Sequence, residues 1–126
     1  MNRKLLFVLM LSVLMLSIVG VTAAQDNYTI GLSLSTLNNP FFVTLRDGAQ
    51  KTADDLGVTL VVVDSQDDPA TEATNIEDLI AQGVDAILVN PTDGDAIVPS
   101  IEAANAAGIP VFTIDRSANG GEVVSH

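Results

Sequence analysis

The clearest structural signal in the chain is the stretch Gly57-Val58-Thr59-Leu60-Val61-Val62-Val63-Asp64-Ser65-Gln66-Asp67-Asp68-Pro69. Residues 58–63 are β-branched or aliphatic without interruption, which is typical of a strand covered on both faces. The polar residues that follow end in Asp68 and Pro69, a helix cap and a proline suited to the first helical position. The stretch therefore predicts a buried strand that leads through a polar turn into a helix.

The same succession of strand, polar turn and helix occurs on both sides of this stretch. Between the strands, apolar residues recur at three- and four-residue steps, as on one face of a helix. The glycines placed to end the helices, Gly57, Gly83 and Gly108, are 26 and 25 residues apart, which is the spacing of βαβ units. Strands are predicted at residues 28–34, 58–63, 84–89 and 111–114, and helices at residues 41–56, from Pro69 to Gly83, and from Asp93 or Asp95 to Gly108.

We therefore predict an α/β fold, an open parallel sheet with flanking helices. Its elements alternate in the order β-α-β-α-β-α-β, and right-handed crossovers make the strands parallel. Residues 120–126 look like a turn and the start of a fifth strand. With 126 residues, the chain is long enough for one domain.

Residues 1–24 have the organisation of a secretory signal peptide. A short basic start is followed by an apolar run at residues 5–19 and then by small residues that end in an A-x-A-like site. Cleavage after Ala23 or after Ala24 fits equally well. The alternative is a retained membrane anchor, because the apolar run approaches the roughly 20 residues that span a bilayer. We expect cleavage, since a polar stretch follows at once, and hence a periplasmic or otherwise extracytoplasmic protein.

The composition excludes several kinds of chemistry. The chain has no Cys and its only His is His126, so a thiolate metal site or a His-based triad has nothing to be built from. The formal charge of −11 repels nucleic-acid phosphates. The acidic turn with Asp64, Asp67 and Asp68 lacks the spacing of a calcium-binding loop, and no phosphate-binding glycine motif is present. We therefore predict no enzyme, no metal or other cofactor, and no nucleic-acid partner.

Four polar or aromatic clusters follow the predicted strands. In an open α/β sheet, ligands bind in the crevice outside the carboxyl ends of the strands. Clusters that are far apart in the sequence are therefore expected to meet at one rim. They are residues 38–42, residues 65–69, residues 90–93 and the pair Asp115-Arg116.

Phe41 and Phe42 begin a helix at this rim. Aromatic side chains supply flat apolar surfaces that suit the C–H faces of a sugar ring. Phe42 is in phase with Leu45 and Ala49, so we expect Phe42 to pack in the core and Phe41 to face the crevice. Asn39 has two competing roles, as the cap of the helix or as a hydrogen-bond partner of a ligand, and geometry alone leaves the two even.

Asp115 and Arg116 directly follow a short apolar strand. Asp accepts and Arg donates, and such charge-assisted hydrogen bonds to a neutral sugar are strong. The alternative for this pair is a local surface ion pair. Asn90 ends the third strand, where it is either a ligand group or part of an ordinary Asx-turn. We expect Asp93 to be a helix cap rather than a ligand.

Taken together, these segments resemble the N-terminal lobe of the bacterial periplasmic ribose-binding proteins, which are type I periplasmic sugar-binding proteins. The matches occur in the family's order and cover nearly all of the chain after the signal peptide. They are residues 35–42, residues 47–51, Asp64-Ser65-Gln66, residues 90–93, Asp115-Arg116 and residues 121–126.

The resemblance implies a protein with two similar α/β lobes that closes on a sugar held between them. Such a protein delivers the sugar to an ABC-type importer, and some members also signal to a chemoreceptor. The resemblance also implies roles for six residues. For Asn39, whose two roles geometry leaves even, it favours the ligand role. Asn39 would hydrogen-bond the sugar, Phe41 and Phe42 would flank its ring, and Asn90, Asp115 and Arg116 would hydrogen-bond its hydroxyls.

The family pattern has two lobes, and the 126 residues match one of them. We therefore expect residues 25–126 to be an incomplete N-terminal sugar-binding lobe that associates with itself, through an exposed edge at Val123 and Val124, and binds sugar weakly. Two other functions stay open. One is a sensor or receptor ectodomain of the same fold, which a retained anchor would favour. The other is an exported α/β enzyme whose catalytic residues lie in further sequence.

Overall fold

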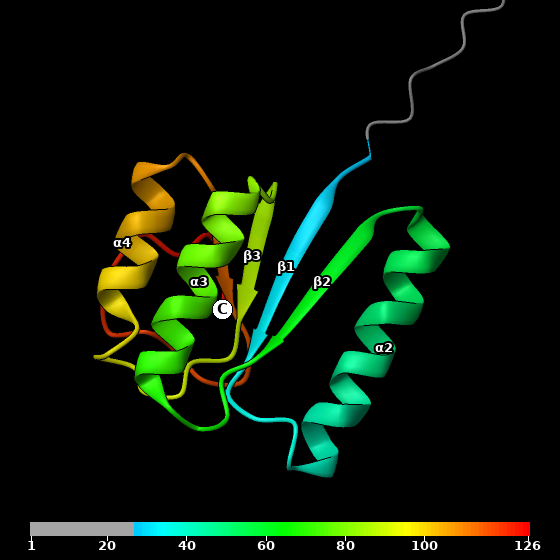
Figure 1. The fold of residues 1–126 in the computed structure, drawn as a ribbon, viewed down its shortest axis with the longest axis horizontal. Coiled ribbons are helices and arrows are strands. Elements are labelled where there is room, and N and C mark those ends of the chain that lie inside the picture. The colour runs from blue at the N-terminus through cyan, green and yellow to red at the C-terminus, as the bar shows by residue number, and fades with distance from the viewer. Residues whose placement is uncertain (1–26) are drawn as a thin grey trace, which may run out of the picture.

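The computed structural model describes residues 27–126, and the predicted signal peptide at residues 1–24 lies outside them. The described part forms a four-stranded parallel sheet in the order β2-β1-β3-β4 with helices on both faces, as predicted (Figure 1). No helix in this part is both long enough and apolar enough to cross a bilayer. The strands are β1 (Thr29–Leu34), β2 (Thr59–Asp64), β3 (Ala86–Val89) and β4 (Val111–Thr113), and the helices are α2 (Pro40–Leu56), α3 (Pro69–Gln82) and α4 (Val98–Ala106).

The first strand lies in the middle of the sheet. β1 pairs with β2 on one side, from Thr29↔Thr59 to Leu34↔Asp64. On its other side β1 pairs with β3, and β3 in turn pairs with β4. The chain therefore reverses its direction of travel across the sheet between β1 and β3, which is the place where open α/β sheets bind ligands.

The caps predicted from the sequence fix the ends of α2 and α3. The side chain of Asn39 accepts a hydrogen bond at the start of α2, and that of Asp68 does so at the start of α3. Each cap is followed by a proline in the first turn of its helix. Gly57 and Gly83 end the two helices in the left-handed conformation, with φ of 70° in both cases.

The predicted start of the third helix was wrong. We expected it at Asp93 or Asp95, but α4 begins at Val98. Asp93 instead closes a turn ahead of the helix, because its Oδ1 accepts from the amides of Asp95 and Ala96. Pro99 has no amide hydrogen, so regular helical hydrogen bonding begins beyond it, where the amide of Ile101 donates to the carbonyl of Ile97.

The predicted start of a fifth strand is present as a single parallel bridge. The amide of Val124 donates to the carbonyl of Val111, and the amide of Thr113 donates to the carbonyl of Ser125. The bridge joins Phe112 and Ser125 beside β4. This segment therefore begins to extend the sheet beyond β4.

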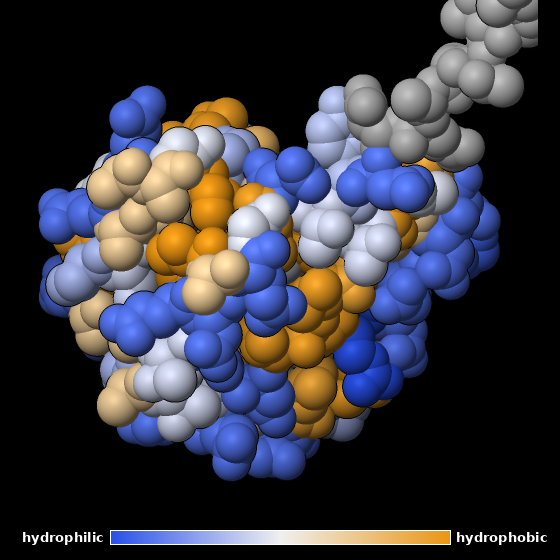
Figure 2. Space-filling view, turned by 45° about the horizontal axis from the view of Figure 1, so that its top comes forward, coloured by the Kyte–Doolittle hydropathy of each residue, from blue (hydrophilic) through white to orange (hydrophobic). Residues whose placement is uncertain are grey.

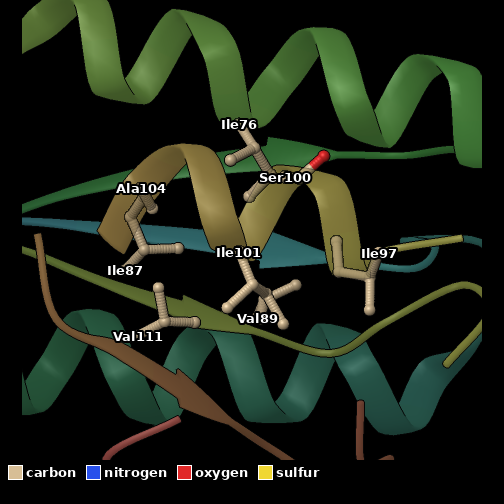
Figure 3. A pocket seen from close by; sticks show the side chains of 8 residues that line it. All are labelled: Ile76, Ile87, Val89, Ile97, Ser100, Ile101, Ala104 and Val111. Carbon is tan, nitrogen blue, oxygen red and sulfur yellow. The ribbon is translucent and has the colours of Figure 1, made fainter. Parts of the chain in front are cut away.

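The two faces of the sheet are covered differently. We call the side beneath α3 and α4 the closed face, and its buried side chains form one apolar core. Figure 3 shows aliphatic side chains of α3, α4, β3 and β4 converging there, and the space between them admits no water molecule. The closed-face core consists of Ile76, Leu79, Val84, Ile87, Val89, Ile97, Ile101, Ala104, Ile109 and Val111.

We call the opposite side, beneath α2, the open face. Its buried centre is Leu32, Leu34 and Phe42, and the other side chains packed there are only partly buried. A groove of about 410 Å³ runs along α2. In Figure 2 a hydrophobic band occupies the hollow beside the polar outer surface of α2. The groove is lined by Ile30, Leu45, Gly48, Ala49, Thr52, Ala53, Leu56, Val58, Leu60 and Leu88.

Candidate ligand-binding site

The predicted site residues lie at the carboxyl end of the sheet. Figure 1 shows the turns that follow β1, β2 and β3 at this end, together with the first turn of α2. β1 and β3 are adjacent, so the clusters at residues 38–42 and 90–93 flank the point where the chain reverses across the sheet. The rim predicted from the sequence is therefore present at the carboxyl end of the sheet.

Asn90 connects three strands beneath the rim. Its side chain is fully buried, and its Oδ1 accepts from Ser35 Oγ at 2.6 Å. Its Nδ2 donates to the carbonyl of Ile114 at 2.9 Å and to Asp115 Oδ2 at 3.2 Å. The Asx-turn considered for Asn90 is therefore wrong, because its partners are 24 to 55 residues away.

Both amide hydrogens of Asn90 are used within the protein. A primary amide has two donors and an oxygen with two lone pairs. One lone pair of Oδ1 remains for a further partner after the bond from Ser35. A direct contact between Asn90 and a ligand stays a prediction, and the structure gives Asn90 a second task, which is to fix the position of Asp115.

Asp115 has a left-handed backbone conformation. Its φ is +63°, in the left-handed region that L-residues other than Asn and Asp seldom occupy. The amide of Arg116 donates to the carbonyl of Ile114 at 2.7 Å, which closes a three-residue turn around Asp115. An aspartate tolerates this conformation because its short polar side chain can hydrogen-bond locally.

Arg116 contacts the loop that follows β3. Its Nη1 donates to the carbonyl of Pro91 at 3.2 Å and to that of Thr92 at 3.5 Å. Arg116 forms no ion pair with any residue in 27–126, so the alternative of an Asp115–Arg116 surface pair is wrong. Guanidinium carries five N–H donors. Its Nε and Nη2 donate to no residue of the described part and are thus left for another acceptor.

Phe41 and Phe42 differ in burial, as predicted. Phe42 is 3% exposed and belongs to the open-face core, whereas Phe41 is 55% exposed. Their ring centroids are 5.1 Å apart in an edge-to-face arrangement. Phe42 therefore supports Phe41, and Phe41 presents an aromatic surface at the rim. The predicted contact of Phe42 with a sugar ring stays a prediction, and very little of its surface is accessible in this conformation.

Asn39 caps α2 and keeps donors free. Its Oδ1 accepts from the amide of Phe41 at 2.9 Å. Its Nδ2 has no hydrogen-bond partner among the residues that the structure describes. The two roles that we considered for Asn39 are therefore compatible, because capping uses the oxygen and leaves the amide hydrogens for a ligand.

Sequence reasoning missed the contact between Glu72 and Thr92. Glu72 is 1% exposed, and its carboxylate accepts from the amide and from the hydroxyl of Thr92. Burial raises the pKa of Glu72, while the hydrogen bonds from Thr92 and the charge of Arg116 oppose the rise. The signal was available, since Glu72 lies on the same helical stripe as Ile76 and Leu79.

In the acidic turn after β2, the carboxylates of Asp64 and Asp68 accept hydrogen bonds from backbone amides. Asp64 accepts from the amides of Leu37 and Gln66. Hydrogen bonds from the hydroxyl and the amide of Thr71 lower the pKa of Asp68. Within residues 27–126 no group of three side chains could hold a metal ion.

Comparisons with known proteins identify the family to which the chain belongs. A model of the periplasmic binding protein domain matches residues 30–126. The chain belongs to the periplasmic binding protein family. Among curated members of this family, the ribose import binding protein of Escherichia coli K12 is 52% identical over the whole chain, and that of Haemophilus influenzae is 55% identical over 88% of it. The chain spans 42% and 37% of the lengths of these two relatives.

Solved structures of the periplasmic binding protein family share the fold. A solute-binding protein from Mycobacterium smegmatis with bound glycerol is 37% identical, with a TM-score of 0.72 over 75% of this chain and 33% of that one. The myo-inositol-binding protein of Caulobacter is 27% identical, with a TM-score of 0.75 over 84% of this chain and 36% of that one. The predicted fold, one α/β lobe of a two-lobe binding protein, is confirmed.

Proposed function

We propose that the chain is the N-terminal lobe of an extracytoplasmic protein that binds ribose or a similar monosaccharide and delivers it to an ABC-type importer. One observation carries the proposal: an exposed aromatic ring, and hydrogen-bond donors that have no partner within residues 27–126, lie at the carboxyl end of the sheet. The ring is that of Phe41, and the donors belong to Asn39 and Arg116. The similarity to ribose import binding proteins supports ribose as the first ligand to test.

The chemistry of the rim suits a neutral sugar. A sugar ring has apolar C–H faces that pack against an aromatic side chain, and its hydroxyls both donate and accept. Arg116 and Asn39 would supply donors, and the exposed carboxylate of Asp115 would supply acceptors. The overall charge of −11 disfavours an anionic ligand. Binding rather than catalysis is the function that we assign to this set of groups.

The proposal includes a second lobe and a closing motion. In a two-lobe protein, the ligand shifts the population from open to closed states through contacts that exist only in the closed state. The rim at Phe41 and Arg116 would then be one half of the site. The proposal also includes cleavage of residues 1–24, a membrane permease as the partner, and a chemoreceptor as a second partner.

Isothermal titration calorimetry of the full-length gene product against ribose, other pentoses and hexoses tests the function. We expect ribose binding in the wild type and a loss of tenfold or more in Arg116→Gln, because charged hydrogen bonds contribute about 1.5–3 kcal/mol. Arg46→Gln is the matched control, since among residues 27–126 Arg46 forms an ion pair only with its exposed neighbour Asp47. Absence of binding heat with every sugar would remove the proposal.

We also propose that the chain associates with itself after cleavage of the signal peptide. The groove along α2 is apolar, and Leu56 and Val124 are 68% and 61% exposed. Exposed apolar surface and unpaired strand edges favour association. Sedimentation velocity should show concentration-dependent association that Leu56→Lys reduces. A stable monomer at high concentration would contradict this proposal.

A further inference from the structure

The chain contains one buried ionisable side chain within residues 27–126, that of Glu72. It projects from the first turns of α3 toward the loop that follows β3. Burial of a carboxylate costs free energy unless donors compensate it. A buried charge next to a candidate binding rim therefore requires an explanation.

Within the described part of the chain, the hydrogen-bond donors to the Glu72 carboxylate all belong to Thr92. The amide of Thr92 lies 3.1 Å from Oε1 and 3.2 Å from Oε2, and the hydroxyl of Thr92 lies 2.8 Å from Oε2. An ionised carboxylate only accepts hydrogen bonds, so it matches this set of donors. Glu72 therefore attaches the loop after β3 to α3.

Arg116 also contacts this loop, through the other polar group of the peptide that binds Glu72. The carbonyl of Pro91 and the amide of Thr92 belong to one peptide group. The amide donates to Glu72, and the carbonyl accepts from Arg116 Nη1 at 3.2 Å. Hydrogen bonds in such a chain polarise one another. The negative charge of Glu72 also attracts the guanidinium, which is why Arg116 opposes the rise in the pKa of Glu72.

We infer that Glu72 is a positioning residue, which holds Arg116 in place for the ligand through the Pro91–Thr92 peptide group. The inference rests on the proposed function, because it assigns Glu72 a task in sugar binding. The inference predicts an unusual combination of effects when this buried charge is removed. Removing the charge while keeping the shape should weaken ligand binding without weakening the fold, since an isosteric neutral side chain is cheaper to bury.

The test compares Glu72→Gln with wild type in the full-length protein, by calorimetry with ribose and by thermal unfolding without it. We expect the affinity for ribose to fall about threefold to tenfold, as for the loss of one hydrogen bond. The unfolding midpoint should stay the same or rise. Unchanged affinity would overturn the inference, and so would affinity and midpoint falling together, because Glu72 would then have a structural role only.

Three further variants serve as controls. Glu77→Gln changes an exposed carboxylate on the same helix and should alter neither quantity. Thr92→Val removes the hydroxyl bonded to Glu72 and should weaken binding, whereas Thr92→Ser keeps that hydroxyl and should restore it. If Thr92→Val and Thr92→Ser bind ribose equally well, the hydroxyl contact has no part in positioning.

A measurement without ligand separates this inference from the proposed function. Nitrogen-15 relaxation of the Arg116 Nε–H group reports the order of the guanidinium. We expect Arg116 to become more mobile in Glu72→Gln and to stay unchanged in Glu77→Gln. If wild type fails to bind ribose, the proposed function fails, and the relaxation data still decide whether Glu72 positions Arg116. Equal order in wild type and Glu72→Gln would overturn the positioning role.

Discussion

The closed and open faces belong to the same strands, but helices cover and bury them to different degrees. Beneath α3 and α4, the side chains are buried and leave no space for water. Beneath α2, a single helix covers the sheet beside β2 and leaves an apolar groove. The comparison shows that the apolar pattern of a strand specifies which residues face inward on each side, while burial depends on how many helices are present to cover them.

Neighbouring residues of β3 illustrate this difference. Ile87 faces α4 and is 1% exposed, whereas Leu88 faces the groove and is only partly buried. Both are aliphatic residues of similar size in one strand, and successive residues of a strand point to opposite faces. They therefore offer a direct comparison of the two faces with the strand held constant.

The largest effect is expected from Ile87→Ala. We expect the free energy of unfolding to fall by about 2–5 kcal/mol. Truncation of a buried aliphatic side chain leaves a cavity that the surrounding core fills only partly by relaxing. Leu88→Ala should cost only about 1 kcal/mol, since part of that side chain is already in contact with water. Denaturant unfolding of both variants measures the difference.

Ile87→Val is a milder substitution at the same position, which can be measured even if Ile87→Ala does not fold. It should cost about 0.5–1.5 kcal/mol and should keep a cooperative transition. Equal costs for Ile87→Ala and Leu88→Ala would break the comparison, because the open face would then be as well packed as the closed one.

An intermediate effect is expected from adding one methyl group to each face. A Cβ at Gly31 would lie 2.8 Å from Cδ1 of Leu79, which is fully buried, so Gly31→Ala should cost about 1–3 kcal/mol. A Cβ at Gly48 would meet nothing within 4 Å. Gly48→Ala should therefore stabilise α2 by about 0.5–1 kcal/mol through helix propensity. Opposite shifts in the unfolding midpoint are expected, and shifts of the same sign would contradict the packing difference.

The smallest effect concerns the pH dependence of stability at the edge of the closed face. Burial raises the pKa of Glu72 above its ordinary value of 4.5, so the folded state binds its proton more tightly than the unfolded state does. The contribution of Glu72 to stability is therefore present below pH 4.5 and is lost as the pH rises through the raised pKa. The stability of wild type relative to Glu72→Gln should decline over that interval.

The exposed carboxylate of Asp93 provides the contrast in sign. Hydrogen bonds from the amides of Ala96 and Asp95 lower its pKa. Its contribution is therefore present above its ordinary value of 3.8 and is lost as the pH falls through the lowered pKa. Urea unfolding of wild type, Glu72→Gln and Asp93→Asn across acidic pH measures both. A wild-type curve parallel to that of Glu72→Gln would show that burial of Glu72 does not perturb its ionisation.

The sequence predicted what depends on local chemistry. Caps, prolines and left-handed glycines are short-range signals, so α2 and α3 were placed nearly to the residue. The start of α4 was misplaced because Asp93 bonds a turn as readily as a helix. Aspartate alone does not distinguish the two.

The part of the site that escaped prediction depends on long-range partners. The donors of Asn90 are taken up by groups 24 and 25 residues away, and Glu72 finds Thr92 20 residues away. Such contacts exist only once the sheet has assembled. The division of work between Phe41 and Phe42 was predictable, because helical periodicity already separates their directions.

The central place of β1 affects the order in which the chain acquires structure. β1 comes first in the sequence, yet both of its partners come later, and its pairing with β2 extends to Asp64. Its second pairing is completed only with Val89. During synthesis, β1 therefore has no sheet partner until β2, which follows it by 30 residues in the register Thr29↔Thr59, has emerged. Non-local pairing of this kind slows folding, and until β2 and β3 arrive the apolar side chains of Leu32 and Leu34 lack the sheet that buries them.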